Sequence, residues 1–191
     1  MHWADFAAQT LSQRGDKHII ASGITPSGEF HIGHLREILT GDMITRACKN
    51  AGLDAEFVFI VDSADPLRKV YPFLSDEYEE YIGCALATIP APDENGKPGN
   101  DGRTYAQHFL EPFLAALEQI DVRPRIIDNY TSYANGEFAD KSRIACEKAD
   151  EIREIIERVS GRELADDWFP YNPYGHDGSL DGVTVLSLIH I

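Results

Sequence analysis

The stretch Ser22–His34, SGITPSGEFHIGH, constrains the fold more than any other part of this chain. The apolar run Lys17–Ala21 precedes it and is typical of a buried strand, while Leu35–Asn50 follows it with apolar residues at helical spacing. The stretch is therefore expected to be a loop that joins a strand to a helix. Open α/β sheets bind nucleotides at such junctions, because the N–H groups of the first helical turn have no partner within the helix and attract phosphate oxygens.

Two histidines and two glycines in this loop favour a nucleotide site. His31 and His34 are three residues apart, so at the start of a helix they would lie on one face. Gly28 and Gly33 have no Cβ and would let the main chain approach a ligand closely, and Pro26 would stiffen the loop. The loop contains neither the GK[ST] of a Walker motif nor the G-x-G-x-x-G dinucleotide fingerprint. Another class of nucleotide site is therefore indicated.

On their own, two histidines at this spacing would more often be surface side chains of an ordinary strand–helix turn. The surrounding residues change that interpretation, because Pro26–His34, PSGEFHIGH, resembles the HIGH signature of class I aminoacyl-tRNA synthetases. Further segments occur in an order similar to that of the archaeal-type class I lysyl-tRNA synthetases, which are also found in some bacteria, and the similarity extends to about Val185. These segments are MHWAD, ASGITPSG, DPLRKVYPFL, YAQHFLEPF and DWFPYN.

The order of elements predicts the α/β class. A short helix is expected at Trp3–Leu11 and a second strand at Asp54–Asp62, and strand, helix and strand of these lengths form a βαβ unit with parallel strands. The resemblance implies that residues 1–76 are the first half of a Rossmann-like ATP-binding domain. It also implies that residues 77–181 are a mainly helical insertion, and that residues 182–185 return to the catalytic domain.

Within the insertion, the sequence predicts an exposed loop at Pro90–Arg103, an amphipathic helix at Tyr105–Ile120 and a short strand at Arg125–Asp128. A long helical run at Lys141–Val159 is expected to turn its isoleucines inward and to end at Gly161.

The last residues of the chain stand apart from this pattern. Residues 186–191, LSLIHI, look like the translation of a sequencing adapter and are expected to be a non-native tail. No KMSKS-like loop is present, nor any segment that resembles an anticodon-binding domain. The resemblance therefore predicts that the chain is an N-terminal fragment of a longer enzyme, inactive by itself.

Charge and cysteine content narrow the class of protein. A net charge of −15 argues against a nucleic-acid binder that works through bulk charge. The excess of acidic residues is typical of proteins from a high-salt source. It is also compatible with a protein that binds tRNA mainly through parts outside this chain. The three widely spaced cysteines, together with the absence of a secretory signal or an apolar run long enough to span a membrane, predict a cytoplasmic protein. Nothing in the sequence predicts its oligomeric state.

The resemblance implies a lysine–tRNA ligase, which uses ATP to activate L-lysine as lysyl-adenylate and transfers it to tRNA(Lys), with Mg²⁺ bridging the phosphates. Because the attacking carboxylate is already ionised, catalysis would depend on positioning and on charge stabilisation, with His31 and His34 donating to phosphate oxygens. Two alternatives stay open: another HIGH-motif nucleotidylyltransferase, and a non-catalytic paralogue that binds lysine or tRNA. The residues expected to bind ATP are Pro26, Ser27, Gly28, Gly33, His31 and His34.

For lysine, the resemblance implicates Gly23 and Thr25. Neither can neutralise an ammonium group, which needs a carboxylate or an aromatic face. Asp62 and Asp65 follow the second strand at the same edge of the sheet and are the carboxylate candidates. Asp65 has a second and more common interpretation, as the N-cap of a helix that begins at Pro66.

Many enzymes of this family hold zinc in the insertion, through Cys and His before the YAxHF segment and a CxxC after DWxPxN. This chain has Asn100–Gly102 and Gly175–Gly178 at those places. Structural zinc needs about four ligands, mostly thiolates and imidazoles, so the missing cysteines predict that no metal is bound. The side chains that remain as conceivable ligands are His108, His176, Asp93 and Asp101.

Overall fold

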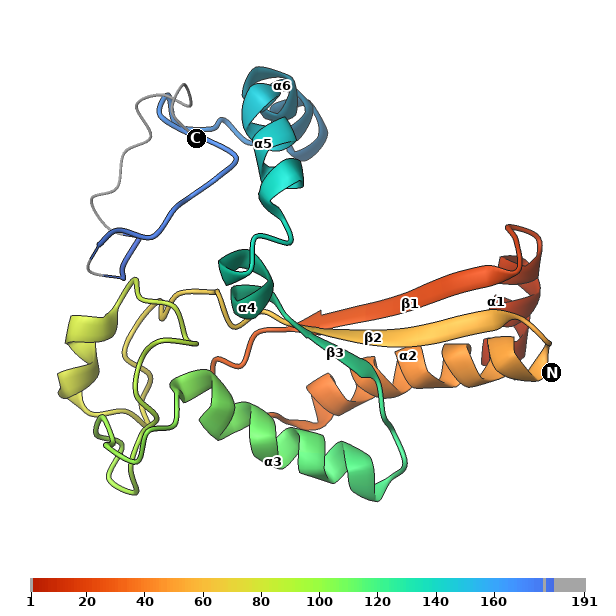
Figure 1. Ribbon diagram of the computed structural model, residues 1–191, viewed down its shortest axis with the longest axis horizontal. Helices are drawn as coiled ribbons and strands as arrows, with labels where there is room; N and C mark the ends of the chain where they lie inside the picture. The colour runs from red at the N-terminus through yellow and green to blue at the C-terminus, as the bar shows by residue number, and fades with distance from the viewer. Residues whose placement is uncertain (1, 177, 181–191) are drawn as a thin grey trace.

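The computed structural model describes residues 2–176 and 178–180 of the 191-residue chain as an α/β protein (Figure 1). The predictions for residues 182–185 and 186–191 concern residues outside this set. No helix in the described part is both long and apolar enough to cross a membrane. The elements are α1 (Trp3–Ser12), β1 (Lys17–Ile24), α2 (Ile32–Asn50), β2 (Asp54–Val61), the 3₁₀ helix η1 (Asp76–Tyr81), α3 (Tyr105–Gln119), β3 (Arg125–Asp128), α4 (Asn129–Ala134), α5 (Ala139–Glu147) and α6 (Ala149–Ser160).

The sheet has three parallel strands in the order β1-β2-β3. Ile24 at the end of β1 pairs with Val61 at the end of β2, and Val61 pairs in turn with Asp128 at the end of β3. The three carboxyl ends therefore lie side by side, and the predicted βαβ unit is confirmed. The loops that follow them leave the sheet at one edge, which is where open α/β sheets place their ligands.

One face of the sheet carries the core. Figure 1 shows α2 running beside the strands with α3 near it, and a buried apolar cluster joins Ile38 of α2 and Phe113 of α3 to Phe59 of β2. Gly41 permits the close packing of α2, because a Cβ there would lie 2.4 Å from the ring of Phe57. On the opposite face, Ile19 of β1 is 61% exposed.

A second layer, residues 62–104, extends beyond the carboxyl edge of the sheet. It has its own buried cluster, in which Leu67, Tyr78 and Leu86 pack against Tyr105 and Phe109 of α3. The Tyr105 hydroxyl donates a hydrogen bond of 2.8 Å to the main-chain oxygen of Ser27. Helix α3 thus anchors this layer to the loop that follows β1.

Two expectations about the insertion need correction. The strand Arg125–Asp128 was assigned to the insertion, but as β3 it pairs with β2 in the central sheet. The long helix is interrupted at Lys148, whose φ of −111° and ψ of 25° leave the helical region, so α5 and α6 are separate. The apolar side of α6 is only partly covered: Ile152 and Ile156 are half-buried, whereas Ile155 and Val159 are 50% and 77% exposed. The boundary at residue 77 stays a prediction.

Candidate active site

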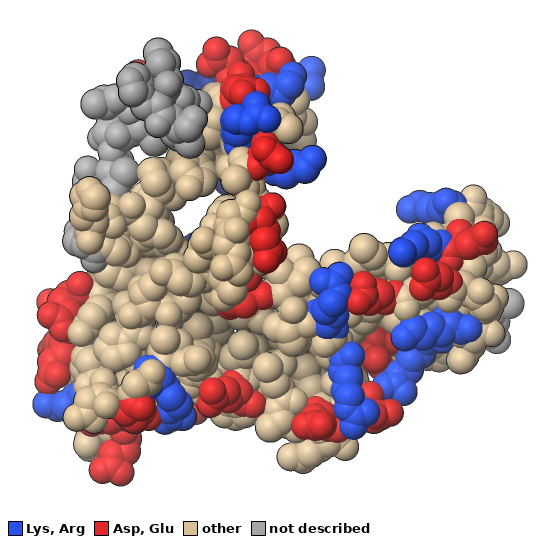
Figure 2. Space-filling model, in the orientation of Figure 1, with Lys and Arg blue, Asp and Glu red and all other residues tan. Residues whose placement is uncertain are grey.

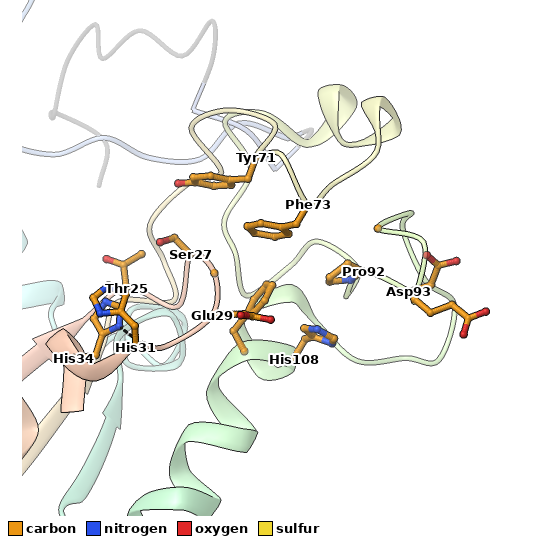
Figure 3. A pocket seen from close by; sticks show the side chains of 14 residues that line it. Thr25, Ser27, Glu29, His31, His34, Tyr71, Phe73, Pro92, Asp93 and His108 are labelled. Carbon is orange, nitrogen blue, oxygen red and sulfur yellow. Dashed lines mark hydrogen bonds between the residues drawn. The ribbon is translucent and has the colours of Figure 1, made fainter.

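The loop between β1 and α2 forms one wall of a cavity of about 630 Å³ (Figure 3). Five of the predicted site residues line it: Thr25, Ser27, Gly28, His31 and His34. Pro26 is a buried residue of the loop itself, and Gly33 lies in the first turn of α2. The expected junction of strand, loop and helix therefore exists, and it borders a cavity large enough for a nucleotide.

The two histidines cap the helix. His31 is the N-cap residue of α2, and its Nδ1 accepts a hydrogen bond of 3.0 Å from the main-chain N–H of Gly33. The Nδ1 of His34 accepts a bond of 3.1 Å from the N–H of His31. Together these bonds form a capping box built from imidazoles instead of the usual hydroxyl and carboxylate.

This arrangement fixes the tautomer of both rings. Each Nδ1 accepts a main-chain proton, so in the neutral imidazoles the ring proton is carried by Nε2. The rings lie against one another with centroids 4.0 Å apart. Two N–H donors are thereby held at the N-terminus of α2, where the helix dipole also favours negative charge. Such a pair suits an anionic group such as a phosphate.

Gly33 serves this geometry directly. A Cβ at Gly33 would lie 2.7 Å from Cε1 and 2.9 Å from Nδ1 of His31. The absence of a side chain at Gly33 thus leaves room for the neighbouring imidazole, in addition to the predicted close approach of a ligand.

Burial lowers the pKa of His34, and the neighbouring His31 lowers it further, whereas Glu37 raises it. We expect ¹H–¹⁵N spectra of the imidazoles to show His34 protonating below the ordinary histidine value of about 6.5. Because the folded pKa is the lower one, this group stabilises the fold above about pH 6.5, and that contribution is lost as the pH falls through the folded pKa. Glu37→Gln should lower the pKa of His34 further. A midpoint for His34 at or above 6.5 would contradict the described packing.

A second cluster lies where β1 and β2 end. The Thr25 hydroxyl donates a hydrogen bond of 3.0 Å to the Asp65 carboxylate. The Cβ position of Gly23 lies 3.6 Å from Oδ2 of Asp62. The four residues considered for lysine are therefore neighbours. Burial raises the pKa of Asp62, and the charge of Asp65 raises it further.

The N-cap interpretation of Asp65 is wrong, because no helix begins at Pro66. Pro66 instead forms an antiparallel bridge with Ala85. The Asp65 carboxylate is shared between Thr25 and Arg68, whose guanidinium lies 3.4 Å away. This carboxylate therefore belongs to the edge of the sheet rather than to a helix end.

Asn129 belongs to this cluster, although no motif in the sequence points to it. Its Nδ2 donates a hydrogen bond of 2.9 Å to Oδ1 of Asp62, and its Oδ1 accepts one of 2.9 Å from the N–H of Ala64. The preceding residue, Asp128, accepts a hydrogen bond from the Ser63 hydroxyl. Both residues follow from the position of β3. Because β3 is parallel to β2, its carboxyl end lies at the same edge of the sheet as those of β1 and β2.

No cluster of three or more His, Cys, Asp or Glu side chains suited to a metal ion occurs among residues 2–176 and 178–180. Asp93, Asp101 and His108 line a neighbouring cavity of about 560 Å³. Two contacts hold the loop that lines this cavity. Arg103 forms an ion pair of 2.7 Å with Asp101, and Oδ1 of Asp93 accepts a hydrogen bond of 2.8 Å from the main-chain N–H of Lys97. The absence of zinc stays a prediction.

Comparisons with known proteins identify similar chains. Residues 1–189 match the family model described as tRNA synthetases class I (K). The chain is 43% identical over 173 residues to a lysine–tRNA ligase of Methanosarcina barkeri, covering 91% of this chain and 31% of that protein. It is 44% identical over 188 residues to one of Archaeoglobus fulgidus, covering 98% of this chain and 37% of that protein. The lysine–tRNA ligase of Methanocaldococcus jannaschii is 42% identical over 174 residues, covering 90% of this chain and 32% of that protein. The chain thus spans about a third of the length of these relatives.

Proposed function

Since this chain belongs to the family of class I tRNA synthetases of the K type, we propose that it carries the ATP-binding half-site of a lysine–tRNA ligase. The reaction begins with attack of the lysine carboxylate on the α-phosphate of ATP, and pyrophosphate leaves. Lysine is then transferred from the adenylate to tRNA(Lys). The curated relatives compared above all have the name lysine–tRNA ligase.

The observation that carries this proposal is the imidazole capping box. Both rings of His31 and His34 border the cavity, and the tautomer fixed by their Nδ1 acceptors leaves an Nε2–H on each. As negative charge shifts between the phosphate oxygens in the transition state, these two donors and the N-terminus of α2 stabilise it. Neither ring has to take up a proton, because the nucleophile is already a carboxylate.

The same site supports separate roles for its other residues. Ser27 and Gly28 line the cavity, where their main chain would contact the triphosphate, while Pro26 and Gly33 keep the loop and the first helical turn in shape. On the sheet edge, Gly23 leaves room for the substrate, and Thr25 and Asn129 hold the Asp65 and Asp62 carboxylates. These two carboxylates are the groups that bind the ammonium groups of lysine.

Mg²⁺ usually retains several waters and binds through substrate phosphates and one or two carboxylates. The cavity fits this requirement, because Glu29 lines it on the same loop as the histidines. Glu29 would be the carboxylate available to Mg²⁺. The ion would supply positive charge that offsets the charge of the phosphates.

Binding of tRNA would depend on specific contacts more than on a basic surface. On the face shown in Figure 2, Lys and Arg lie beside Asp and Glu, and no broad basic surface is formed. This pattern agrees with the net charge of −15. A protein of this kind binds nucleic acid with little help from bulk charge.

The test is pyrophosphate exchange into ATP by the protein expressed from its complete gene. Exchange that depends on L-lysine, followed by charging of tRNA(Lys), is the expected result. Exchange that depends on another carboxylic acid but not on lysine would favour the alternative nucleotidylyltransferase. Binding of lysine or tRNA without any exchange would favour the non-catalytic paralogue.

Replacing Asp62 by asparagine is expected to stabilise the protein while weakening its use of lysine. Because the pKa of Asp62 is raised in the fold, its stabilising contribution is present below the unfolded pKa and is lost as the pH rises through the folded value. Removing the charge should therefore raise Tm at pH 7, with a smaller difference at acidic pH. The KM for lysine should rise about 10-fold or more, because an ionic contact is lost.

The matched control is Asp54→Asn, at the other end of β2, where the carboxylate is exposed and 3.9 Å from Lys17. It should change neither Tm nor the KM for lysine by much. Thermal melts at two pH values and exchange at varied lysine measure both effects. A Tm at pH 7 that falls in Asp62→Asn would contradict the described environment of this carboxylate.

A further inference from the structure

An exposed aromatic ring stands in the cavity without an assigned role. Phe73 is 46% exposed and lines the cavity together with Tyr71. In Figure 3 these rings lie one above the other, and both histidines lie on the opposite side of Phe73 from Asp93. A large apolar ring at this place offers a flat surface to whatever enters the cavity.

Contacts on several sides hold the Phe73 ring in place. Tyr71 stacks on it with centroids 5.6 Å apart and planes within 4°, and Phe109 meets it edge-on at 5.6 Å. Gly28 of the loop faces the ring tip, since a Cβ there would lie 3.4 Å from Cζ of Phe73. The main chain is fixed as well: Gly96 has φ of +74°, and its Cβ position lies 2.3 Å from the carbonyl oxygen of Phe73. The part of the ring that stays exposed is therefore preorganised, which lowers the entropy cost of binding.

The charges around the cavity set the direction of a nucleotide. The imidazoles and the N-terminus of α2 attract phosphate, and Glu29 beside them would be offset by Mg²⁺, whereas Asp93 and Glu94 line the same cavity and repel phosphate. Carboxylates do accept hydrogen bonds from hydroxyl and amino groups. A nucleotide whose phosphate lies at the histidines therefore extends its sugar and base away from them, toward the Phe73 ring and the carboxylates.

We propose that Phe73, supported by Tyr71, is a stacking platform for the adenine base of a nucleotide substrate. This inference rests on the proposed function, which supplies two adenine nucleotides: ATP, and the 3′-terminal adenosine of tRNA. Stacking of a base on an aromatic side chain suits either of them, because it depends on the flat ring and not on base-edge readout.

The experiment compares Phe73→Leu, which keeps the apolar volume but removes the aromatic face, with Phe73→Tyr, which restores that face. Both are made in the protein expressed from its complete gene. If ATP supplies the base, Phe73→Leu should raise the KM for ATP in lysine-dependent exchange by roughly 10-fold. If tRNA supplies it, exchange should be unchanged and the KM for tRNA in aminoacylation should rise by a similar factor. Phe73→Tyr should behave like the wild type in each case.

A matched control is Phe6→Leu on α1, where the ring is 65% exposed and outside the cavity. Calorimetric titration with ATP and with the trinucleotide CCA provides a readout that does not need lysine. Weaker binding of either probe by Phe73→Leu alone supports the platform even if exchange proves not to depend on lysine. Exchange, charging and binding that are all unchanged in Phe73→Leu overturn the platform and leave the proposed function intact.

Discussion

His31→Ala is expected to lower the rate of lysine-dependent pyrophosphate exchange by about 10²-fold or more. The substitution removes one of the two Nε2–H donors that the capping box directs to the site. Because this donor acts mainly on charge that develops in the transition state, the loss should appear in kcat more than in the KM for ATP. Steady-state exchange at varied ATP, with the protein expressed from its complete gene, separates the two parameters.

The same substitution also removes a helix cap, which would cost about 1 kcal/mol of stability. His31→Asn separates the two effects, because asparagine is a good N-cap residue but cannot place a donor where the imidazole Nε2–H lies. We expect both variants to lose exchange and only His31→Ala to show a lower Tm. Near-normal exchange by His31→Asn would contradict the role of the imidazole.

Gly33→Ala is expected to be the second most damaging change to activity, although it adds only a methyl group. The new Cβ would lie 2.7 Å from Cε1 of His31, so the imidazole has to move. Displacement of a catalytic group by about 1 Å can cost on the order of 10²-fold in rate. Stability should change little, because the preference of a helix for alanine over glycine, up to about 1 kcal/mol, offsets the loss of the cap bond between Gly33 and His31 when the imidazole moves.

Gly41→Ala in the same helix is the matched comparison, and its effects should be reversed. Its Cβ would lie 2.4 Å from the ring of Phe57, which is buried in the core and cannot move freely. Overpacking of this kind costs roughly 1–3 kcal/mol, partly offset by the helix preference of alanine. We therefore expect Gly41→Ala to have a lower Tm. At temperatures well below that Tm it should keep its pyrophosphate exchange activity. If Gly33→Ala keeps wild-type exchange, the close contact with His31 does not control the site.

The sequence alone determined the part of the site that is contiguous in the chain. A strand beginning at Lys17, the HIGH loop and the helix that follows were predicted because apolar periodicity, glycine placement and the motif all act over a few residues. Their bounds were less exact: β1 ends at Ile24 instead of Ala21, and α2 begins at Ile32 instead of Leu35. The βαβ unit and its parallel strands followed from the same local signals. The amphipathic helix predicted at Tyr105–Ile120 is also present, as α3, and Phe109 and Phe113 lie on its buried side.

The tertiary structure alone decided which side chains meet across the sheet edge. Thr25 and Asp65 are 40 residues apart, and Asp62 and Asn129 are 67 apart, so no local pattern could pair them. The same reason explains why Asp65 was mistaken for a helix cap and why Phe73 was not recognised in the cavity. Amphipathic spacing in α6 predicted a buried face that is covered only in part, because a periodic pattern identifies an apolar face but not how much of it another surface covers.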